Sequence, residues 1–218
     1  MMKRKFGIVC MILGAGLILG AAYLLMINQQ EDTFARESSE DAMAALVQQI
    51  QENTKETLPA SDTMPELELY KPVDLLTEEE KKMTEVVIDG IPYIGYLSIP
   101  KLELDLPIIS TWNYTLLNVA PCRYVGTVRG EDLVLMAHNY DSHFGKLSQL
   151  ETGDTVTFTD MDGEITCYEV VGEDILAPTA VEEMTAGVFD LTLFTCTYGG
   201  KTRLVVYCDR QQAKLDNR

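Results

Sequence analysis

The stretch Leu191-Thr-Leu-Phe-Thr-Cys-Thr-Tyr-Gly-Gly-Lys-Thr-Arg-Leu-Val-Val-Tyr207 contains two β-type runs around a Gly-Gly pair. Glycine suits a two-residue primed hairpin turn, because both turn residues need positive φ. If Gly199 and Gly200 form that turn, Cys196 pairs directly with Arg203, and the two side chains project to the same face. A guanidinium beside a thiol favours the thiolate and can bind a carbonyl oxygen or an oxyanion. The competing interpretation, from this hairpin alone, is a small buried cysteine and an edge-strand arginine.

The rest of the chain from Tyr93 onward also consists of short β-rich runs separated by turn residues. This pattern is typical of an all-β, mainly antiparallel, closed or nearly closed barrel. The predicted strands cover residues 93–99, 106–109, 133–137, 155–159, 165–171, 191–196 and 203–208, with short helices at 113–119 and 179–184. Asp160-Met-Asp-Gly163 joins two strands as a hairpin turn; a calcium site would need further ligands at loop spacing, which the sequence lacks.

Histidine is scarce, with only His138 and His143 in the chain. His138 ends the apolar run Leu133–Ala137, and a side chain at a strand end is held rigidly while it still reaches the rim of a barrel. A cysteine acyl-transfer enzyme needs such a group to protonate a leaving amine. His143 lies in a polar loop, where we expect a solvated or loop-packing residue.

Two other kinds of chemistry find less support. The histidines and thiols do not have the paired spacing of a structural zinc site, so no metal is expected. Ser142 and Ser148 lack the Gly-x-Ser-x-Gly elbow of a serine hydrolase.

The N-terminal residues 6–27 carry no charged side chain. At about 1.5 Å per helical residue this run spans roughly the 30 Å hydrocarbon core of a bilayer, and predicts a transmembrane anchor. Lys3, Arg4 and Lys5 precede it, so residues 1–5 are expected to be cytoplasmic and the rest of the chain extracytoplasmic. A cleaved signal peptide is the alternative, although its apolar core is shorter, about 7–15 residues.

Residues 28–89 are predicted to form a helical stalk and an acidic linker. Met43, Leu46, Val47 and Ile50 fall on one stripe of an amphipathic helix over 38–56, which packs on the barrel or on a second copy. Pro59, Pro65 and Pro72 then exclude a continuous helix. Thr77-Glu-Glu-Glu80 has the spacing of a capping box and predicts a short helix over 78–85.

The composition of the chain indicates which kinds of partner and how many domains to expect. The net charge of -17 argues against nucleic-acid binding, which needs clustered Lys and Arg. The hydrophobic content of 46% is ample for one packed domain, predicted at 90–210 and followed by a tail at 211–218. The four cysteines outside the membrane run, Cys122, Cys167, Cys196 and Cys208, are enough for two disulfides, and sequence leaves their redox state open.

The segment Thr192-Leu-Phe-Thr-Cys196, with His138 upstream at a strand end and Arg203 on the following strand, resembles the Thr-Leu-x-Thr-Cys signature of the sortases. The resemblance covers about residues 90–210 and includes the N-terminal anchor. It implies an eight-stranded barrel without a cofactor. It also implies Cys196 as nucleophile, His138 as acid and base, Arg203 as oxyanion partner, and Thr195 and Asn139 as substrate-binding residues.

The same resemblance implies the reaction and its partners. A sortase cleaves a C-terminal sorting signal similar to Leu-Pro-x-Thr-Gly on a secreted protein and passes the acyl group to an amine of a cell-wall precursor or a pilin. His138-Asn-Tyr140 looks most like class B enzymes, whereas the segment 177–190 is shorter than the helical insertion of that class, so the class stays open. The alternatives are a non-catalytic extracellular barrel that binds peptide or glycan, with Cys196 buried or in a disulfide, and a cysteine peptidase of another fold. The papain-like order, with Cys before His, is not the order found in this chain.

Overall fold

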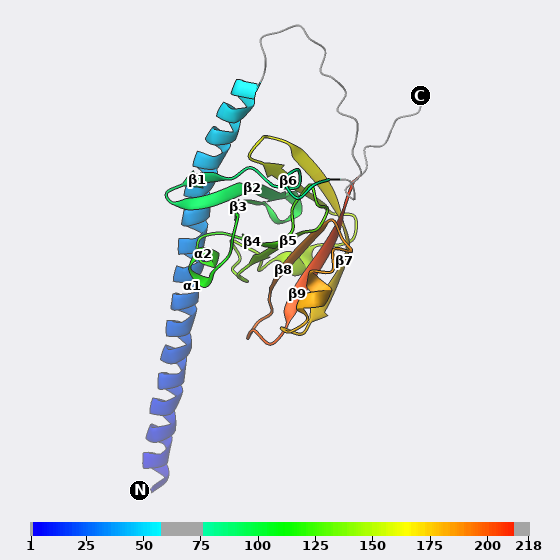
Figure 1. The fold of residues 1–218 in the computed structure, drawn as a ribbon. Helices are drawn as coiled ribbons and strands as arrows, with labels where there is room; N and C mark the ends of the chain where they lie inside the picture. Colours follow the sequence, from blue (N-terminus) through cyan, green and yellow to red (C-terminus); the bar gives the residue numbers. More distant parts are fainter. Residues whose placement is uncertain (1, 58–75, 212–218) are drawn as a thin grey trace.

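The computed structural model describes residues 2–57 and 76–211, which form one long helix and a β-barrel beside it (Figure 1). Side chains are described from residues 11 to 53 and from 76 to 211. The predicted proline-containing linker around Pro59, Pro65 and Pro72 lies outside the described residues, and so does nearly all of the predicted tail.

The barrel is a closed ring of eight strands with mixed pairing. In the described part of the chain nine strands form one sheet in the order β1-β2-β3-β4-β5-β8-β9-β7-β6, and the pairing of β6 with β2 closes the ring. The bounds are β1 Val86–Ile88, β2 Ile91–Ile99, β3 Leu104–Ile109, β4 Cys122–Val125, β5 Leu133–Ala137, β6 Thr155–Asp160, β7 Ile165–Leu176, β8 Leu191–Cys196 and β9 Arg203–Arg210. β1 is a hairpin extension of β2 outside the ring.

The predicted all-β barrel is confirmed, with local corrections. All seven predicted strands are present, but β1 and β4 were not predicted, and β7 runs five residues past its predicted end at 171. β3 pairs with β4, and β5 with β8, in parallel, and the other pairings are antiparallel, so the sheet is mainly antiparallel as predicted. The short helices are α2 Tyr114–Leu117 and α3 Val181–Met184.

The predicted helix over 78–85 is wrong. Thr77 and Glu80 do make the capping-box contacts, with the Thr77 amide donating to the Glu80 carboxylate at 2.8 Å and the Glu80 amide to the Thr77 hydroxyl at 3.3 Å. Only one turn follows, at residues 78–81, before the chain extends toward β1. A cap satisfies orphan amides, but one turn without a packed apolar face gains too little to propagate a helix.

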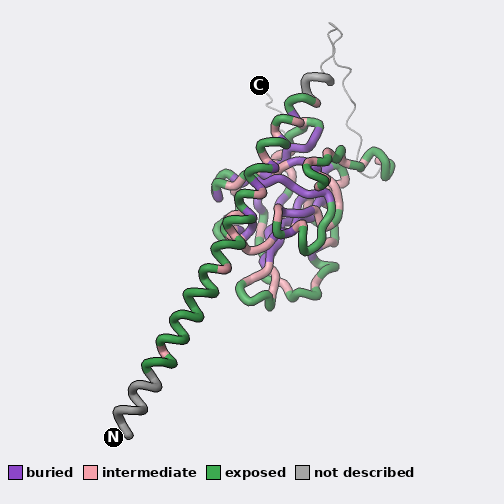
Figure 2. Tube along the Cα trace, turned by 90° about the vertical axis from the view of Figure 1, so that its left-hand side faces the viewer, coloured by how far each residue is buried: buried purple, intermediate pink, exposed green. Residues whose placement is uncertain are grey.

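The helix α1, Met2–Thr57, joins the predicted membrane segment and the predicted stalk into one unbroken element. Its apolar run near the N-terminus is long enough to cross a membrane, and none of the run's described residues, from Met11 onward, is buried. Further on, Ala35, Ser39, Ala42, Leu46 and Ile50 are buried at helical spacing against the barrel (Figure 2). The stripe therefore packs on the barrel of the same chain, and Leu46 and Ile50 are the members that the sequence identified.

Two apolar clusters explain this arrangement. The first fills the barrel interior and includes Leu97, Leu133, Phe158 and Leu193. The second joins Leu46 of α1 to the outer surface of β2, β3 and β4. At the end of α1 the Asn53 amide donates to the Met161 carbonyl in the β6–β7 turn, 3.1 Å away. α1 is thus part of the folded domain and not a separate stalk.

Candidate functional site

The strands β5 and β8 bring His138 and Cys196 to the same place. They run parallel, and Ala137, the last residue of β5, pairs with Thr195. The next residues along the two strands are His138 and Cys196, so both lie at the same end of these two neighbouring strands. Because successive side chains alternate between faces, both also lie on the face opposite the buried Ala137 and Thr195.

The hairpin of β8 and β9 places Arg203 at the same end of the sheet. Cys196 pairs with Arg203, which confirms the predicted register. The turn itself differs from the prediction: the Gly200 amide donates to the Thr197 carbonyl at 2.8 Å, so Tyr198 and Gly199 occupy its centre. Leu204, the next residue of β9, points into the barrel core, and therefore Arg203 shares the outer face with Cys196.

A groove of about 200 Å³ on that outer face holds all three side chains; we call it the Cys196 groove. Thr195 also lines it, although its side chain is buried and its hydroxyl donates to the Ala137 carbonyl at 2.9 Å. Asn139 is not among the lining residues. The full lining is Trp112, Tyr114, Leu117, Tyr124, Met136, Ala137, His138, Pro178, Val181, Met184, Phe194, Thr195, Cys196 and Arg203.

An aromatic wall that the sequence did not reveal forms one side of this groove. The ring of Tyr124 lies 5.4 Å from that of Phe194 and 5.6 Å from that of Trp112, and Trp112 stacks edge-on against Tyr114 at 6.1 Å. These residues come from β4, β8, the loop before α2 and the first position of α2, so no local spacing connects all of them. The wall offers an apolar surface beside the thiol, suited to an apolar peptide side chain.

The His138 ring is half-buried. Burial lowers its pKa below the ordinary 6.5, because the charged imidazolium loses hydration, and the carboxylate of Glu31 opposes that effect. The Tyr140 ring packs 4.9 Å from the His138 ring, and the Tyr140 hydroxyl donates to Glu31 at 3.4 Å. His138 is therefore a group that can take up and release a proton within the pH range of a general acid and base.

Helix α1 holds the loop that begins at His138. The Ser142 amide donates to the Asp32 carboxylate at 2.9 Å, and the Ser142 hydroxyl donates to the same carboxylate at 2.7 Å. His143 is fully buried, with Nε2 3.3 Å from the Ser39 hydroxyl. Of the two predicted settings of His143, the structure shows the loop-packing one. Sequence spacing alone contains no signal for these contacts, since more than 100 residues separate the partners.

The four cysteines Cys122, Cys167, Cys196 and Cys208 are all free thiols. Burial raises the pKa of both the Cys122 and the Cys208 thiols to about 12, so neither is a nucleophile near neutral pH. Cys196 is only partly buried. The non-catalytic barrel required a Cys196 that is buried away from His138 or joined in a disulfide, and the groove contradicts that requirement.

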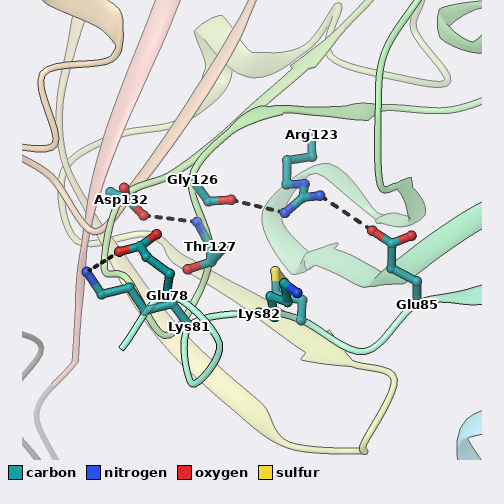
Figure 3. Close-up of a pocket in the computed structure, with 9 residues that line it drawn as sticks. Glu78, Lys81, Lys82, Glu85, Arg123, Gly126, Thr127 and Asp132 are labelled. Atoms are coloured by element: carbon teal, nitrogen blue, oxygen red, sulfur yellow. Dashed lines mark hydrogen bonds and ion pairs between the residues drawn. The ribbon is translucent and has the colours of Figure 1, made fainter. Parts of the chain in front are cut away.

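Another cavity on the surface is less suited to catalysis, because its charged side chains are paired. A larger cavity of about 650 Å³ lies between the 78–85 segment and β4 (Figure 3). Its charged groups pair with one another, as Arg123 does with Glu85 at 3.5 Å and Lys81 with Glu78 at 3.7 Å. Among the described residues no group of three His, Cys, Asp or Glu side chains is arranged to hold a metal ion.

Comparison with known proteins gives the following matches. The model of the Sortase domain family matches residues 97–211. Among solved structures, a sortase D5 transpeptidase of Clostridium perfringens is 16% identical with a TM-score of 0.55, covering 83% of this chain and 99% of its own. Sortase C of Streptococcus pneumoniae is 20% identical with a TM-score of 0.51, covering 86% and 97%. Sortase C of Clostridium perfringens, solved with a C-terminal cell wall sorting motif, is 21% identical with a TM-score of 0.50, covering 79% and 91%. A comparison with curated proteins found no match.

Proposed function

Since this chain belongs to the sortase family of transpeptidases, we propose that it cleaves a C-terminal sorting signal of a secreted protein with Cys196 as nucleophile. One observation supports the proposal. The pairing of β5 with β8 and of β8 with β9 brings Cys196, His138 and Arg203 to the same end of the sheet, where all three line one groove. The sorting signal is similar to Leu-Pro-x-Thr-Gly. Sortase C of Clostridium perfringens, one of the similar structures, was solved with the C-terminal cell wall sorting motif.

The first half of the reaction forms a thioester. The Cys196 thiolate attacks the carbonyl carbon of the threonine in the signal, and the carbonyl oxygen becomes an oxyanion. When the intermediate collapses, the C–N bond breaks and protonated His138 gives its proton to the departing amine. The product is an acyl group on the Cys196 sulfur, with His138 neutral.

The second half transfers that acyl group. An amine from a cell-wall precursor or a pilin attacks the thioester, neutral His138 takes the proton of the amine, and the C–S bond breaks. Cys196 leaves as thiolate and His138 ends protonated, as both began. The order of proton transfers follows from microscopic reversibility of the first half.

Arg203 stabilises the oxyanion in this scheme. Its Nη1 donates to the Gly200 carbonyl at 3.2 Å and to the Thr202 carbonyl at 3.1 Å, which holds the guanidinium against the β8–β9 turn, on the strand position opposite Cys196. Guanidinium has five N–H donors in a planar fork, so donors remain for a substrate carbonyl. Thr195 contributes to the groove wall by joining β8 to β5, and contact of Asn139 with the peptide stays a prediction.

The cellular setting follows from α1. Residues 6–27 are proposed to anchor the chain in the cell membrane with residues 1–5 in the cytoplasm, because Lys3, Arg4 and Lys5 precede the apolar run. The barrel, proposed to span residues 90–210, then lies outside the cell, where secreted substrates and cell-wall amines are found.

The test is to trap the thioester. The full chain in detergent is incubated with a library of sorting-signal peptides, and acyl adducts are located by mass spectrometry. We expect an adduct on Cys196 that is lost in Cys196→Ala and strongly reduced in His138→Gln. Cys167→Ala is the matched control, since Cys167 is also a partly buried free thiol and should leave the adduct unchanged. An adduct that persisted in Cys196→Ala would refute the assignment.

A further inference from the structure

The height of the barrel above the membrane is set by α1. The helix is unbroken, its side chains are almost all exposed from residue 11 to 30, and it first makes hydrogen bonds to the barrel at Glu31 and Asp32. The apolar run ends at Ile27. A helix rises 1.5 Å per residue, so about 6 Å separates Ile27 from Glu31 along the axis. The headgroup layer on each side of a bilayer is about 5–8 Å thick.

Two residues that neighbour the lining of the Cys196 groove, Tyr140 and Asn118, meet α1 at this level. Tyr140, which packs against His138, donates its hydroxyl to Glu31. Asn118, directly after α2, lines a cavity of about 260 Å³ together with Glu31, Phe34 and Tyr140. The side of the groove formed by His138 and Leu117 therefore lies next to residues that contact the first turns of α1 after the apolar run.

The surface around the groove carries exposed aromatic side chains. Phe34, Trp112, Tyr114 and Tyr198 are all exposed, and Tyr198 lies at the tip of the β8–β9 hairpin. Figure 1 shows this hairpin at the end of the barrel that is nearer to the N-terminal part of α1. Tryptophan and tyrosine are the residues enriched where proteins meet the membrane–water interface, because their rings are apolar and their N–H and O–H groups are polar.

We propose that the rim of the Cys196 groove lies in the headgroup layer of the bilayer and that Trp112, Tyr114 and Tyr198 contact lipid there. The proposal rests on the membrane anchorage proposed above. Its consequence concerns the substrate: a donor whose scissile bond lies a few residues from its own membrane-embedded segment reaches Cys196 without leaving the bilayer surface.

The single tryptophan of the chain makes this measurable without a label. The full chain is reconstituted in phosphatidylcholine vesicles that carry a fluorescence quencher on the headgroup or, separately, near the ends of the acyl chains. The chain ends lie at the centre of a hydrocarbon core about 30 Å thick, so the loss of Trp112 emission with the headgroup quencher should be at least about threefold larger. Equal losses, or no loss with the headgroup quencher, would overturn the proposal.

A spacer variant changes the height of the barrel above the bilayer without changing the barrel itself. Inserting about seven helix-forming residues after Ile27 adds two turns and raises the barrel by ~10 Å with its orientation nearly kept. The headgroup quenching of Trp112 should fall to the level of the protein in unlabelled vesicles, and thioester formation with a soluble peptide should be unchanged. Quenching that the spacer leaves unaltered would refute the assigned height. Because quenching requires no turnover, its outcome is independent of whether Cys196 is the nucleophile.

Discussion

Acidification is expected to destabilise this protein mainly through the more deeply buried of its two histidines, His143. Burial lowers the His143 pKa from 6.5 to about 4. Between these values the unfolded chain binds a proton that the folded chain does not, so the free energy of unfolding falls as the pH falls through this window and is fully retained above 6.5. At about 1.4 kcal/mol per pH unit, the difference between the two pKa values corresponds to about 3 kcal/mol.

The measurement is urea unfolding of the full chain in detergent at a series of pH values, followed by Trp112 fluorescence. Carboxylates also titrate toward the acid end of this window, so the informative quantity is the difference between the wild type and His143→Gln. Glutamine does not titrate and can still hydrogen-bond to Ser39. The variant should lose most of the pH dependence above pH ~4.5, to which carboxylates contribute less. Parallel pH profiles for the two proteins would refute the reasoning.

Three further substitutions test the packing and the electrostatics. Leu46→Ala removes a fully buried side chain of α1 from the surface of the barrel and should lower the free energy of unfolding by about 2–5 kcal/mol, whereas Leu25→Ala, on the exposed part of α1, should change it by less than ~0.5 kcal/mol. Gly95→Ala would place a Cβ 2.1 Å from the Thr159 carbonyl oxygen at a φ of +141° and should destabilise by more than ~3 kcal/mol in thermal unfolding, against about 1 kcal/mol for Gly153→Ala, which has positive φ but open space. Glu31→Gln removes a negative charge that raises the His138 pKa, so the basic limb of the pH–rate profile for peptide transfer should move to lower pH, while Glu37→Gln on the same helix leaves it in place.

Local patterns predicted most of the barrel. Strands β5 and β8 match their predicted ranges at both ends, because their apolar runs are bounded by clear turn residues. β4 was missed because Cys122–Val125 is short and mixed in polarity, and only one residue pair, Ile109 with Cys122, joins it to β3. β1 was missed because three residues carry too little periodicity.

The part of the site that depends on neighbouring strands could be predicted, whereas the parts that depend on segments far apart in the sequence could not. The pairing of Cys196 with Arg203 was predictable because a hairpin turn fixes register between neighbouring strands. The position of His138 beside Cys196 depends on the parallel pairing of β5 with β8, whose chains are joined by a long connection that fixes no register. The contacts of Asp32 and Ser39 with the His138 loop depend on α1 continuing unbroken past residue 27, which the sequence did not indicate.

The strand register that brings the site residues together is stabilised by the core and not by the side chains that we propose to be catalytic. In β8, Leu191 and Leu193 are fully buried inside the barrel, whereas Cys196 belongs to the opposite face. A slip of β8 by one residue would exchange the faces, so that both leucines leave the barrel interior and the buried Thr192 and Phe194 enter it. Forcing side chains of the wrong shape into a packed core costs about 1–3 kcal/mol at each position, a large share of the 5–15 kcal/mol that stabilises a typical domain. An isolated thiol and guanidinium, by contrast, gain little from lying side by side at a partly exposed rim. The alternation of side chains along the strands therefore places Cys196, Arg203 and His138 together as a consequence of burying the leucines. Substitutions of these three residues should abolish peptide transfer while leaving the free energy of unfolding nearly unchanged.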